Sequence, residues 1–355
     1  MTQIFVPGIG QFDNIGDIIL RRQLLAWLRP LGELHIYVGD SPSGYDEALG
    51  SLPVDTVYRS FTSWYREAMR SALHGEAAYV CKPGEIQLTV KGMKEHISVL
   101  PLLAVIRRRG GVVARVGAGA RNFAGLPRLL MRPSIALSDL VLWRDAATAD
   151  YLGGEVMPDL AFDDAGTDLS GERDTLAVSL RSDRRMPPVE WIDGVQSFAR
   201  DRDLRLIVVT QVLRDRERSR SLAHALGAEL VDWDGRDHAT QEKALRSEYR
   251  RSALVLSDRL HVLIAAATEG ATPLALLPQY SDKIERHFSA AGISDVAIDS
   301  RGFQTADIVA ALDAAVSRGP ASLDAAREGL SAARSRVAAL LGSARLNREM
   351  ADSSG

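Results

Sequence analysis

Cysteine is nearly absent from this chain: Cys81 is the only one among 355 residues. A single cysteine excludes an internal disulfide and a zinc cluster built on cysteines. A long apolar run is also absent, and the start, "MTQIFVPGIG", enters a strand at once instead of giving a basic and apolar signal. We therefore expect a cytoplasmic protein without a transmembrane segment. Association with the inner face of the membrane stays an open alternative.

Strong net charge and basic runs with interleaved aromatic residues are absent as well. The formal net charge is −3, and the basic runs at 107–109 and 213–221 carry no aromatic residues on which bases would stack. Both runs are typical of solvated helix faces, so we expect no nucleic-acid partner. No cluster of metal-ligating residues is visible, and we expect no metal.

The order of the apolar runs predicts an α/β fold. Short β-branched runs alternate with amphipathic stretches, which is the pattern of parallel sheets with crossover helices. The predicted strands are 3–8, 33–39, 77–84, 111–119, 139–145, 175–183, 204–211, 228–234, 252–258, 272–279 and 295–299. Helical periodicity marks 15–28, 95–109 and 331–346. The simplest account is two Rossmann-like lobes with parallel sheets facing a central cleft.

An acidic stretch separates the two series of strands. Residues 158–174, "PDLAFDDAGTDLSGERD", contain glycine and proline and show no periodicity, as a linker does. The predicted parts are an N-terminal Rossmann-like lobe at 1–160, a linker at 161–174, a C-terminal Rossmann-like lobe at 175–320, and a C-terminal helix and tail at 321–355.

Polar residues follow many of the predicted strands, where ligands of open α/β sheets bind. The candidates are Asn14, Asp17, Lys82, Glu85, Arg144, Arg181, Asp258, Arg259, His261 and Lys283. The segment "LVLSDRLHVL" is the most informative, because Ser257 or Asp258 would cap a helix and place Arg259 and His261 in its first turn. An arginine there needs an anion or a carboxylate partner.

Each candidate also has a purely structural explanation. Arg181 can pair with Asp183 or Asp215, and Asp145 can cap the helix after Arg144. Lys283, four residues before His287, can be a solvated helix residue. The stretch "GIGQFDNIGDIIL" resembles a phosphate-cradling turn, but Asp13 or Asn14 capping the helix and Gly16 allowing close packing explain it equally.

Together the motifs resemble the polysaccharide pyruvyl transferase family. The resemblance rests on "DNIGDIIL", "WRDAATADYL", "PDLAF", "VSLR" and above all "LVLSDRLHVLIAAATEGATPLALLPQYSDKI", in that order along nearly the whole chain. It implies a GT-B-like fold and transfer of pyruvyl from phosphoenolpyruvate onto two sugar hydroxyls, giving a cyclic ketal. Arg259 and His261 match the family's Arg-x-His segment, and Lys283 matches its downstream lysine.

The resemblance also suggests a role for each candidate. Arg181, Arg259, Lys283 and Arg144 would bind phosphoenolpyruvate, a donor substrate rather than a cofactor. His261 would be the general acid, with Asp17 or Glu85 as the base. Asn14, Lys82 and Glu85 would bind a sugar acceptor. The chain departs from the family at "CKPGEIQL", where a run of glycines is usual, so the acceptor's identity stays open, as does its linkage to a lipid.

Two other functions compete with this interpretation. A GT-B glycosyltransferase would use the same cations for the diphosphate of a nucleotide sugar, with Glu269 or Asp282 on the ribose. A non-catalytic carbohydrate-binding or scaffold protein is the third, and retention of Arg259, His261 and Lys283 argues against it. The oligomeric state is not predicted.

Overall fold

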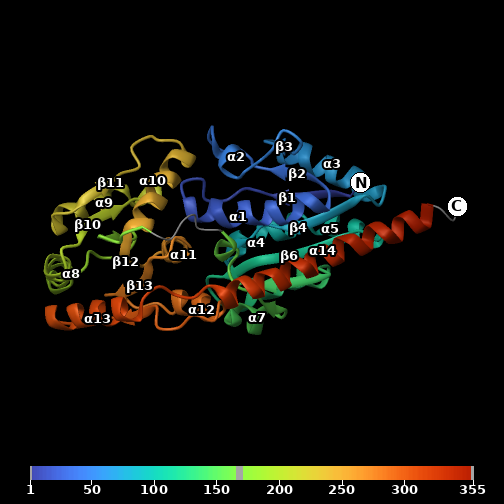
Figure 1. Ribbon diagram of the computed structural model, residues 1–355. Coiled ribbons are helices and arrows are strands. Elements are labelled where there is room, and N and C mark those ends of the chain that lie inside the picture. The colour runs from blue at the N-terminus through green and yellow to red at the C-terminus, as the bar shows by residue number, and fades with distance from the viewer. Residues whose placement is uncertain (1, 165–170, 353–355) are drawn as a thin grey trace. The chain divides into compact units, whose positions relative to one another are not determined.

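The structure, a computed structural model, describes residues 2–164 and 171–352, which form two α/β units (Figure 1). The first unit contains the residues up to Phe12, Ile18–Leu160 and the residues from Arg327 onward. The second contains Asp13–Asp17 and Ala161–Ala326. Part of the predicted linker 161–174, residues 165–170, lies outside the described residues.

The first unit is built on a parallel sheet. Its strands are β1 (Gln3–Pro7), β2 (Glu33–Tyr37), β3 (Thr56–Tyr58), β4 (Ala77–Cys81), β5 (Gly84–Ile86), β6 (Val112–Ala120), β7 (Leu140–Trp143) and β8 (Glu155–Val156). Its helices are α1 (Ile15–Leu28), whose first three residues group with the second unit, α2 (Tyr45–Ala48), α3 (Phe61–Leu73), α4 (Val90–Ser98), α5 (Leu100–Arg108), α6 (Gly125–Ala136), α7 (Ala146–Leu152) and α14 (Asp324–Asp352).

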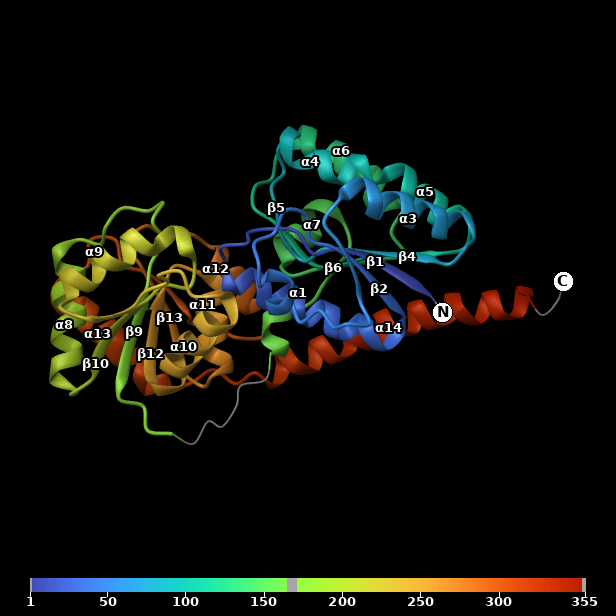
Figure 2. The ribbon, with the colours of Figure 1, turned by 90° about the horizontal axis from the view of Figure 1, so that it is seen from above.

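Strand order gives this sheet a switch point at its centre. The order is β3-β2-β1-β4-β6-β7-β8, with β5 also paired to β6, and every pair is parallel. Figure 2 shows α3, α4 and α5 on one side of the sheet and α1 and α14 on the other. The order reverses between β1 and β4, and ligands of such sheets bind beyond the carboxyl ends of the strands at that point.

The second unit repeats this plan. Its strands are β9 (Thr175–Ser179), β10 (Arg205–Val209), β11 (Glu229–Val231), β12 (Ser252–Ser257), β13 (Thr272–Leu277) and β14 (Ala297–Asp299). Its helices are α8 (Val189–Asp201), α9 (Arg216–Leu226), α10 (His238–Arg251), α11 (Leu260–Thr268), α12 (Lys283–Ser289) and α13 (Thr305–Arg318).

The sheet order of the second unit is β11-β10-β9-β12-β13-β14, again wholly parallel among the described residues. Trp191 and Phe198 of α8 and Leu312 of α13 pack into the core on one face, and α10 and α11 cover the other (Figure 2). Because both faces are covered, the strands are apolar throughout instead of alternating. The switch point lies between β9 and β12. The predicted α/β class with two Rossmann-like lobes is confirmed.

One predicted helix is wrong in detail. The periodic stretch 95–109 is divided between α4 and α5, with Val99 as the junction. Pro101 lies in the first turn of α5, where its missing N–H costs nothing, whereas in one continuous helix that N–H would have to donate to the carbonyl of Ile97. Val99 therefore ends one helix and begins the next.

Three 3-10 turns link these elements: η1 (Arg29–Leu31), η2 (Leu160–Asp163) and η3 (Leu213–Asp215). The C-terminal helix α14 buries Leu330, Ala333, Val337 and Leu341, which lie on one face at helical spacing. No helix among the described residues combines the length and apolarity that crossing a membrane requires.

Candidate functional site

The carboxyl edge of β9 and β12 gathers charged residues in the second unit. These neighbouring strands run parallel up to the pair Ser179–Ser257. Arg181 follows the first strand and Asp258 the second, and Oδ1 of Asp258 accepts the backbone N–H of Arg181 at 2.9 Å. This hydrogen bond joins the two loops at the switch point, where a ligand site is expected.

Asp258 is a carboxyl group with a strongly shifted pKa. Burial raises the pKa of Asp258 to about 6, against the hydrogen bond from Arg181 and the positive charges of Arg259 and Arg181, which lower it. Loss of solvation is the larger effect here because it disfavours the ionised form directly. Such perturbed groups cluster at functional sites.

Arg259 is held rigidly at the start of α11. Its Nε donates to Oδ2 of Asp215 at 2.7 Å, while Oδ1 of Asp215 accepts from the backbone and hydroxyl of Ser182 at 2.9 and 2.8 Å. Asp215 is buried. The guanidinium therefore stays charged and fixed at the sheet edge, as an anion-binding arginine requires.

The expected helix cap is wrong. Arg259, not Ser257 or Asp258, is the N-cap residue of α11. The Ser257 hydroxyl instead accepts the backbone N–H of Arg259 at 2.9 Å and donates to the carbonyl of Ser179 at 2.5 Å. The Asp258 carboxyl is engaged by Arg181, so neither side chain reaches the helix N–H groups.

His261 lies near the carboxylate of Asp17, a residue that the sequence analysis assigned to the N-terminal lobe. Its Nδ1 lies 3.7 Å from Oδ1 of Asp17, and both side chains are nearly buried, at 11% and 15% exposed. A Cβ added at Gly16 would lie 2.2 Å from the Cβ of His261, so this approach depends on a glycine. Sequence order puts residue 17 within 1–160, whereas its contacts group it with the second unit.

The segment Asp13–Asp17 is anchored to the loop after β10. The backbone N–H of Ile15 donates to Gln211, and that of Leu213 donates to Asp13 at 2.8 Å. The Asp13 carboxylate also pairs with Arg214 at 2.8 Å. These contacts place Asp17 beside α11.

Arg181 and Lys283 also follow strands of this sheet, β9 and β13. Nε of Arg181 donates to Oδ1 of Asp183 at 2.7 Å, which is the ion pair considered from the sequence. That bond holds the pKa of Asp183 well below its usual range. Lys283 is the first residue of α12, after β13, and its carbonyl lies 2.8 Å from Nδ1 of His287.

Two predicted residues are engaged inside the protein. Arg144 lies in the first unit, where its NH1 donates to Asp159 at 2.8 Å, and its side chain is only 2% exposed. Asp145 caps α7 through the N–H of Thr148, so the structural explanation holds for it. Asn14 is also buried, and its Oδ1 accepts the N–H of Gly16 at 3.1 Å. Arg144 does not line the pocket that Lys82 and Glu85 share, and Asn14 groups with the second unit.

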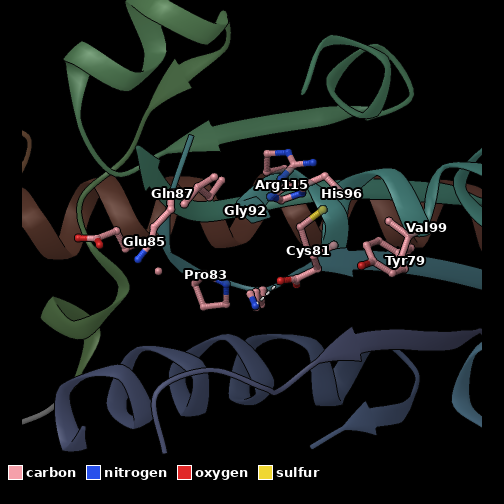
Figure 3. Close-up of a pocket in the computed structure, with 13 residues that line it drawn as sticks. Tyr79, Cys81, Pro83, Glu85, Gln87, Gly92, His96, Val99 and Arg115 are labelled. Atoms are coloured by element: carbon pink, nitrogen blue, oxygen red, sulfur yellow. Dashed lines mark hydrogen bonds and ion pairs between the residues drawn. The ribbon is translucent and has the colours of Figure 1, made fainter. Parts of the chain in front are cut away.

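Lys82 and Glu85 line a pocket of about 190 Å³ in the first unit (Figure 3). Nζ of Lys82 donates to Oε2 of Glu95 at 2.6 Å, and Glu85 pairs with Arg121 at 3.5 Å. Arg115 lines the same pocket and was missed from the sequence. The available signal was a lone charge inside the otherwise apolar strand "GVVARVGAG".

Glu269 and Asp282, the residues considered as ribose ligands of a glycosyltransferase, lie on different helices, and one is buried while the other is exposed. Glu269 lies at the C-terminal end of α11, buried and paired with Arg246 at 2.7 Å and Arg250 at 3.2 Å. This is the opposite end of the helix from His261. Asp282 pairs with Arg286 at 3.2 Å and is exposed. Among the described residues, no group of three or more His, Cys, Asp or Glu side chains is placed to hold a metal ion.

The two parallel sheets define a GT-B-like fold. Similar solved structures support the fold. A UDP-GlcNAc 2-epimerase from Neisseria meningitidis bound to UDP-GlcNAc is 10% identical, with a TM-score of 0.59, over 98% of this chain and 100% of that one. S. aureus MnaA, solved with UDP, is 13% identical, with a TM-score of 0.53, over 93% and 91%.

The family follows from the sequence comparison. The family model for polysaccharide pyruvyl transferase matches residues 14–276, about three quarters of the chain, so this protein belongs to the polysaccharide pyruvyl transferase family. A search of curated proteins gives no match. The match includes Asp17, Arg181, Arg259 and His261 and ends before Lys283.

Proposed function

We propose that this protein transfers pyruvyl from phosphoenolpyruvate onto two hydroxyls of a sugar, forming a cyclic ketal and releasing phosphate. The observation that carries the proposal is the pairing of His261 with Asp17 next to the fixed guanidinium of Arg259. A proton donor and an anion-binding group thus lie two residues apart at the start of one helix, in a chain of the pyruvyl transferase family.

Binding of the donor uses the cations of the second unit. Phosphoenolpyruvate carries a carboxylate and a phosphate, and planar guanidinium groups bind both in a bidentate manner. Arg259 is already oriented by Asp215, and the N–H groups in the first turn of α11 add donors for an anion. Arg181 would exchange Asp183 for the donor, with Lys283 as the third cation. A donor-binding role for Arg144 stays a prediction.

The reaction begins with proton transfer to carbon. His261 gives a proton to the methylene carbon of phosphoenolpyruvate, which becomes a methyl group, and positive charge develops at the neighbouring carbon. A sugar hydroxyl attacks that carbon and loses its proton to a base. The C–O bond to phosphate then breaks, a second hydroxyl attacks, and its proton leaves. Two hydroxyls and one phosphoenolpyruvate thus give one ketal and one phosphate.

Asp17 is the better candidate for the base. Its carboxylate lies 3.7 Å from His261 Nδ1, an ion-pair distance, so the proposed base lies beside the proposed general acid. Glu85 lies in the first unit and pairs with Arg121. Asn14, Lys82 and Glu85 are the residues proposed for the sugar acceptor, which includes lipid-linked sugars. No cofactor takes part in these steps.

The first test measures donor binding through the shift that the donor causes in the thermal unfolding temperature of the whole chain. Phosphoenolpyruvate at a hundred times its dissociation constant should stabilise the protein by about 2.7 kcal/mol, a shift of several degrees. Arg259→Met should abolish the shift, because it removes a charged donor. Arg200→Met, an exposed arginine at the end of α8, is the matched control and should keep it.

His261→Gln separates catalysis from binding. It should keep the thermal shift with phosphoenolpyruvate but reduce phosphate release in the presence of a saccharide panel by about 10²–10⁴-fold, the usual contribution of a general acid. A thermal shift with UDP-GlcNAc and none with phosphoenolpyruvate would contradict the proposal and favour a nucleotide-sugar glycosyltransferase.

A further inference from the structure

Arg115 is a buried cation whose charge is not neutralised by the protein. It lies on β6 and is 1% exposed. Its NH2 donates to the hydroxyl of Ser134 at 3.3 Å, and its guanidinium carbon lies 5.7 Å from the ring centre of Trp143. Its Nε has no hydrogen-bond partner, and among the described side chains, those of residues 2–164 and 171–343, no carboxylate lies at ion-pair distance. A buried guanidinium in that state requires an anion.

The pocket of about 190 Å³ provides the space for that anion. Arg115, Lys82 and His96 all line it, at the carboxyl end of β4 next to the switch point of the first sheet (Figure 3). Burial, together with the charges of Arg115 and Lys82, lowers the pKa of His96 to about 3. His96 is therefore neutral near pH 7 and can hydrogen-bond a ligand without adding charge.

Lys82 is held at the pocket by a carboxylate, whereas Arg115 is not. Glu95 accepts from Lys82 at 2.6 Å, which fixes the ammonium group beside the cavity. Arg115 and Lys82 thus give the pocket two cations. Glu95 pairs with Lys82, and Glu85, the other carboxylate of the lining, pairs with Arg121 outside it. The remaining positive charge matches a single oxyanion group, a phosphate or a carboxylate.

A second, larger cavity adjoins the first. Its volume is about 700 Å³, and it shares Tyr79, Gln87 and Glu95 with the smaller pocket. Tyr37, Phe61 and Trp64 contribute aromatic rings to its walls. Apolar rings with a few polar groups among them are the usual lining of a site for an organic ligand such as a sugar.

We propose that the acceptor is an anionic saccharide, whose oxyanion group pairs with Arg115 and Lys82 in the smaller pocket while its sugar lies in the aromatic-walled cavity. The inference rests on the proposed function only in naming this ligand as the acceptor. The two cavities and the buried guanidinium of Arg115 are properties of the first unit alone.

The test is calorimetric titration of the full chain without phosphoenolpyruvate. The probes are N-acetylglucosamine 1-phosphate, glucuronic acid, glucose and inorganic phosphate. At least one of the two sugar anions should bind, and it should bind about tenfold or more tightly than either glucose or inorganic phosphate. The first two probes distinguish a phosphate from a carboxylate as the anionic group, and the last distinguishes a saccharide from a free anion.

Variants assign the binding to the pocket. Arg115→Met should weaken the sugar anion about tenfold or more, whereas Arg108→Met, an exposed arginine at the end of α5, should not change it. If circular dichroism shows that Arg115→Met does not fold, Lys82→Met, at the pocket rim, decides with the same expectation.

The inference would be overturned if neither sugar anion bound, or if glucose or inorganic phosphate bound as tightly as the sugar anion with the higher affinity. It would also be overturned if the deciding variant bound that sugar anion with unchanged affinity. Because phosphoenolpyruvate is left out, a protein that binds sugar anions but fails to transfer pyruvyl would disprove the proposed function and leave the pocket assignment standing.

Discussion

Asp258 and Asp183 lie on either side of Arg181, and their pKa values shift in opposite directions. Burial raises the pKa of Asp258 to about 6, while the hydrogen bonds from the Arg181 side chain lower the pKa of Asp183. A raised carboxyl pKa means that the folded state binds more protons than the unfolded state between the two values. The two residues should therefore give opposite dependences of stability on pH.

Asp258→Asn should stabilise the protein at pH 8 and have little effect at pH 4. The favourable contribution of the protonated Asp258 is complete below its ordinary pKa of 3.8 and is lost as the pH rises through about 6. At pH 8 the ionised group thus lowers the free energy of unfolding by up to about 3 kcal/mol. Asparagine keeps a side-chain oxygen that can accept the backbone N–H of Arg181. Urea unfolding at pH 4 and at pH 8 measures the change in the free energy of unfolding.

Asp183→Asn is the matched comparison. Its depressed pKa contributes stability that is present above its ordinary pKa and lost as the pH falls, so this variant should destabilise the protein at pH 8. An Asp258→Asn variant that shifts the free energy of unfolding equally at pH 4 and pH 8 would show that ionisation is not the cause.

A site residue could be predicted from the sequence when it differed clearly in polarity from its neighbours in the chain. Arg259 and His261 were predictable because they interrupt an apolar run after a strand. The partnership of Asp17 with His261 was not, since it requires residues far apart in the chain to pack together. Arg115 was missed because a strand buried on both faces leaves no periodic signal for its one polar position.

At the scale of elements, the packing of the segment Asp13–Asp17 against α11 depends on Gly16. An alanine there would bring its Cβ within 2.2 Å of the Cβ of His261, a backbone-attached atom that cannot turn away. Gly16→Ala should therefore destabilise the protein by about 1–3 kcal/mol, as overpacking does. It should also reduce pyruvyl transfer more than phosphoenolpyruvate binding, because it displaces His261 from Asp17.

Gly125→Ala is the control, since a Cβ at Gly125 meets no atom within 4 Å. Urea unfolding and calorimetry with phosphoenolpyruvate measure the two effects. Wild-type stability and turnover in Gly16→Ala would mean that the close approach of these two segments has no role.

Long apolar strands were predictable, as were the three-residue strands β11 and β14, which lie within the predicted runs 228–234 and 295–299, but β3, β5 and β8 were not. β9, β12 and β13 follow the runs of apolar residues closely. β3, β5 and β8 have only two or three residues and form because a neighbouring strand supplies hydrogen bonds, which local sequence does not record. The break before Pro101 was overlooked because the apolar period continues through it.

At the scale of the whole molecule, the first unit is assembled from both ends of the chain. It includes the residues from Arg327 onward, and α14 buries Leu330 completely. Arg336 of the same helix pairs with Glu155 at 2.6 Å. The sequence predicted a C-terminal helix and tail at 321–355 and left open whether the stretch 321–347 packs back on the first lobe or against a partner, because a helix that returns to an earlier lobe leaves no local sign of its destination.

Leu330→Ala should destabilise the first unit by about 2–5 kcal/mol, the usual effect of removing a large buried side chain. Hydrogen exchange resolved by residue should show faster exchange in β4 and β6 and unchanged exchange in β9 and β12. Glu328→Ala, at an exposed position of α14, should change neither. Faster exchange confined to β9 and β12 would assign the helix to the second unit instead.

The return of α14 to the first unit sets the order in which the protein is completed on the ribosome. N-terminal domains usually fold while the rest of the chain is still being made. Here the first unit lacks a helix until some 160 residues of the second unit have been synthesised, roughly 10–30 s later at about 5–20 residues per second. The second unit, whose sequence is almost continuous, can fold first, and the apolar face that α14 covers is exposed to chaperones until α14 has been synthesised.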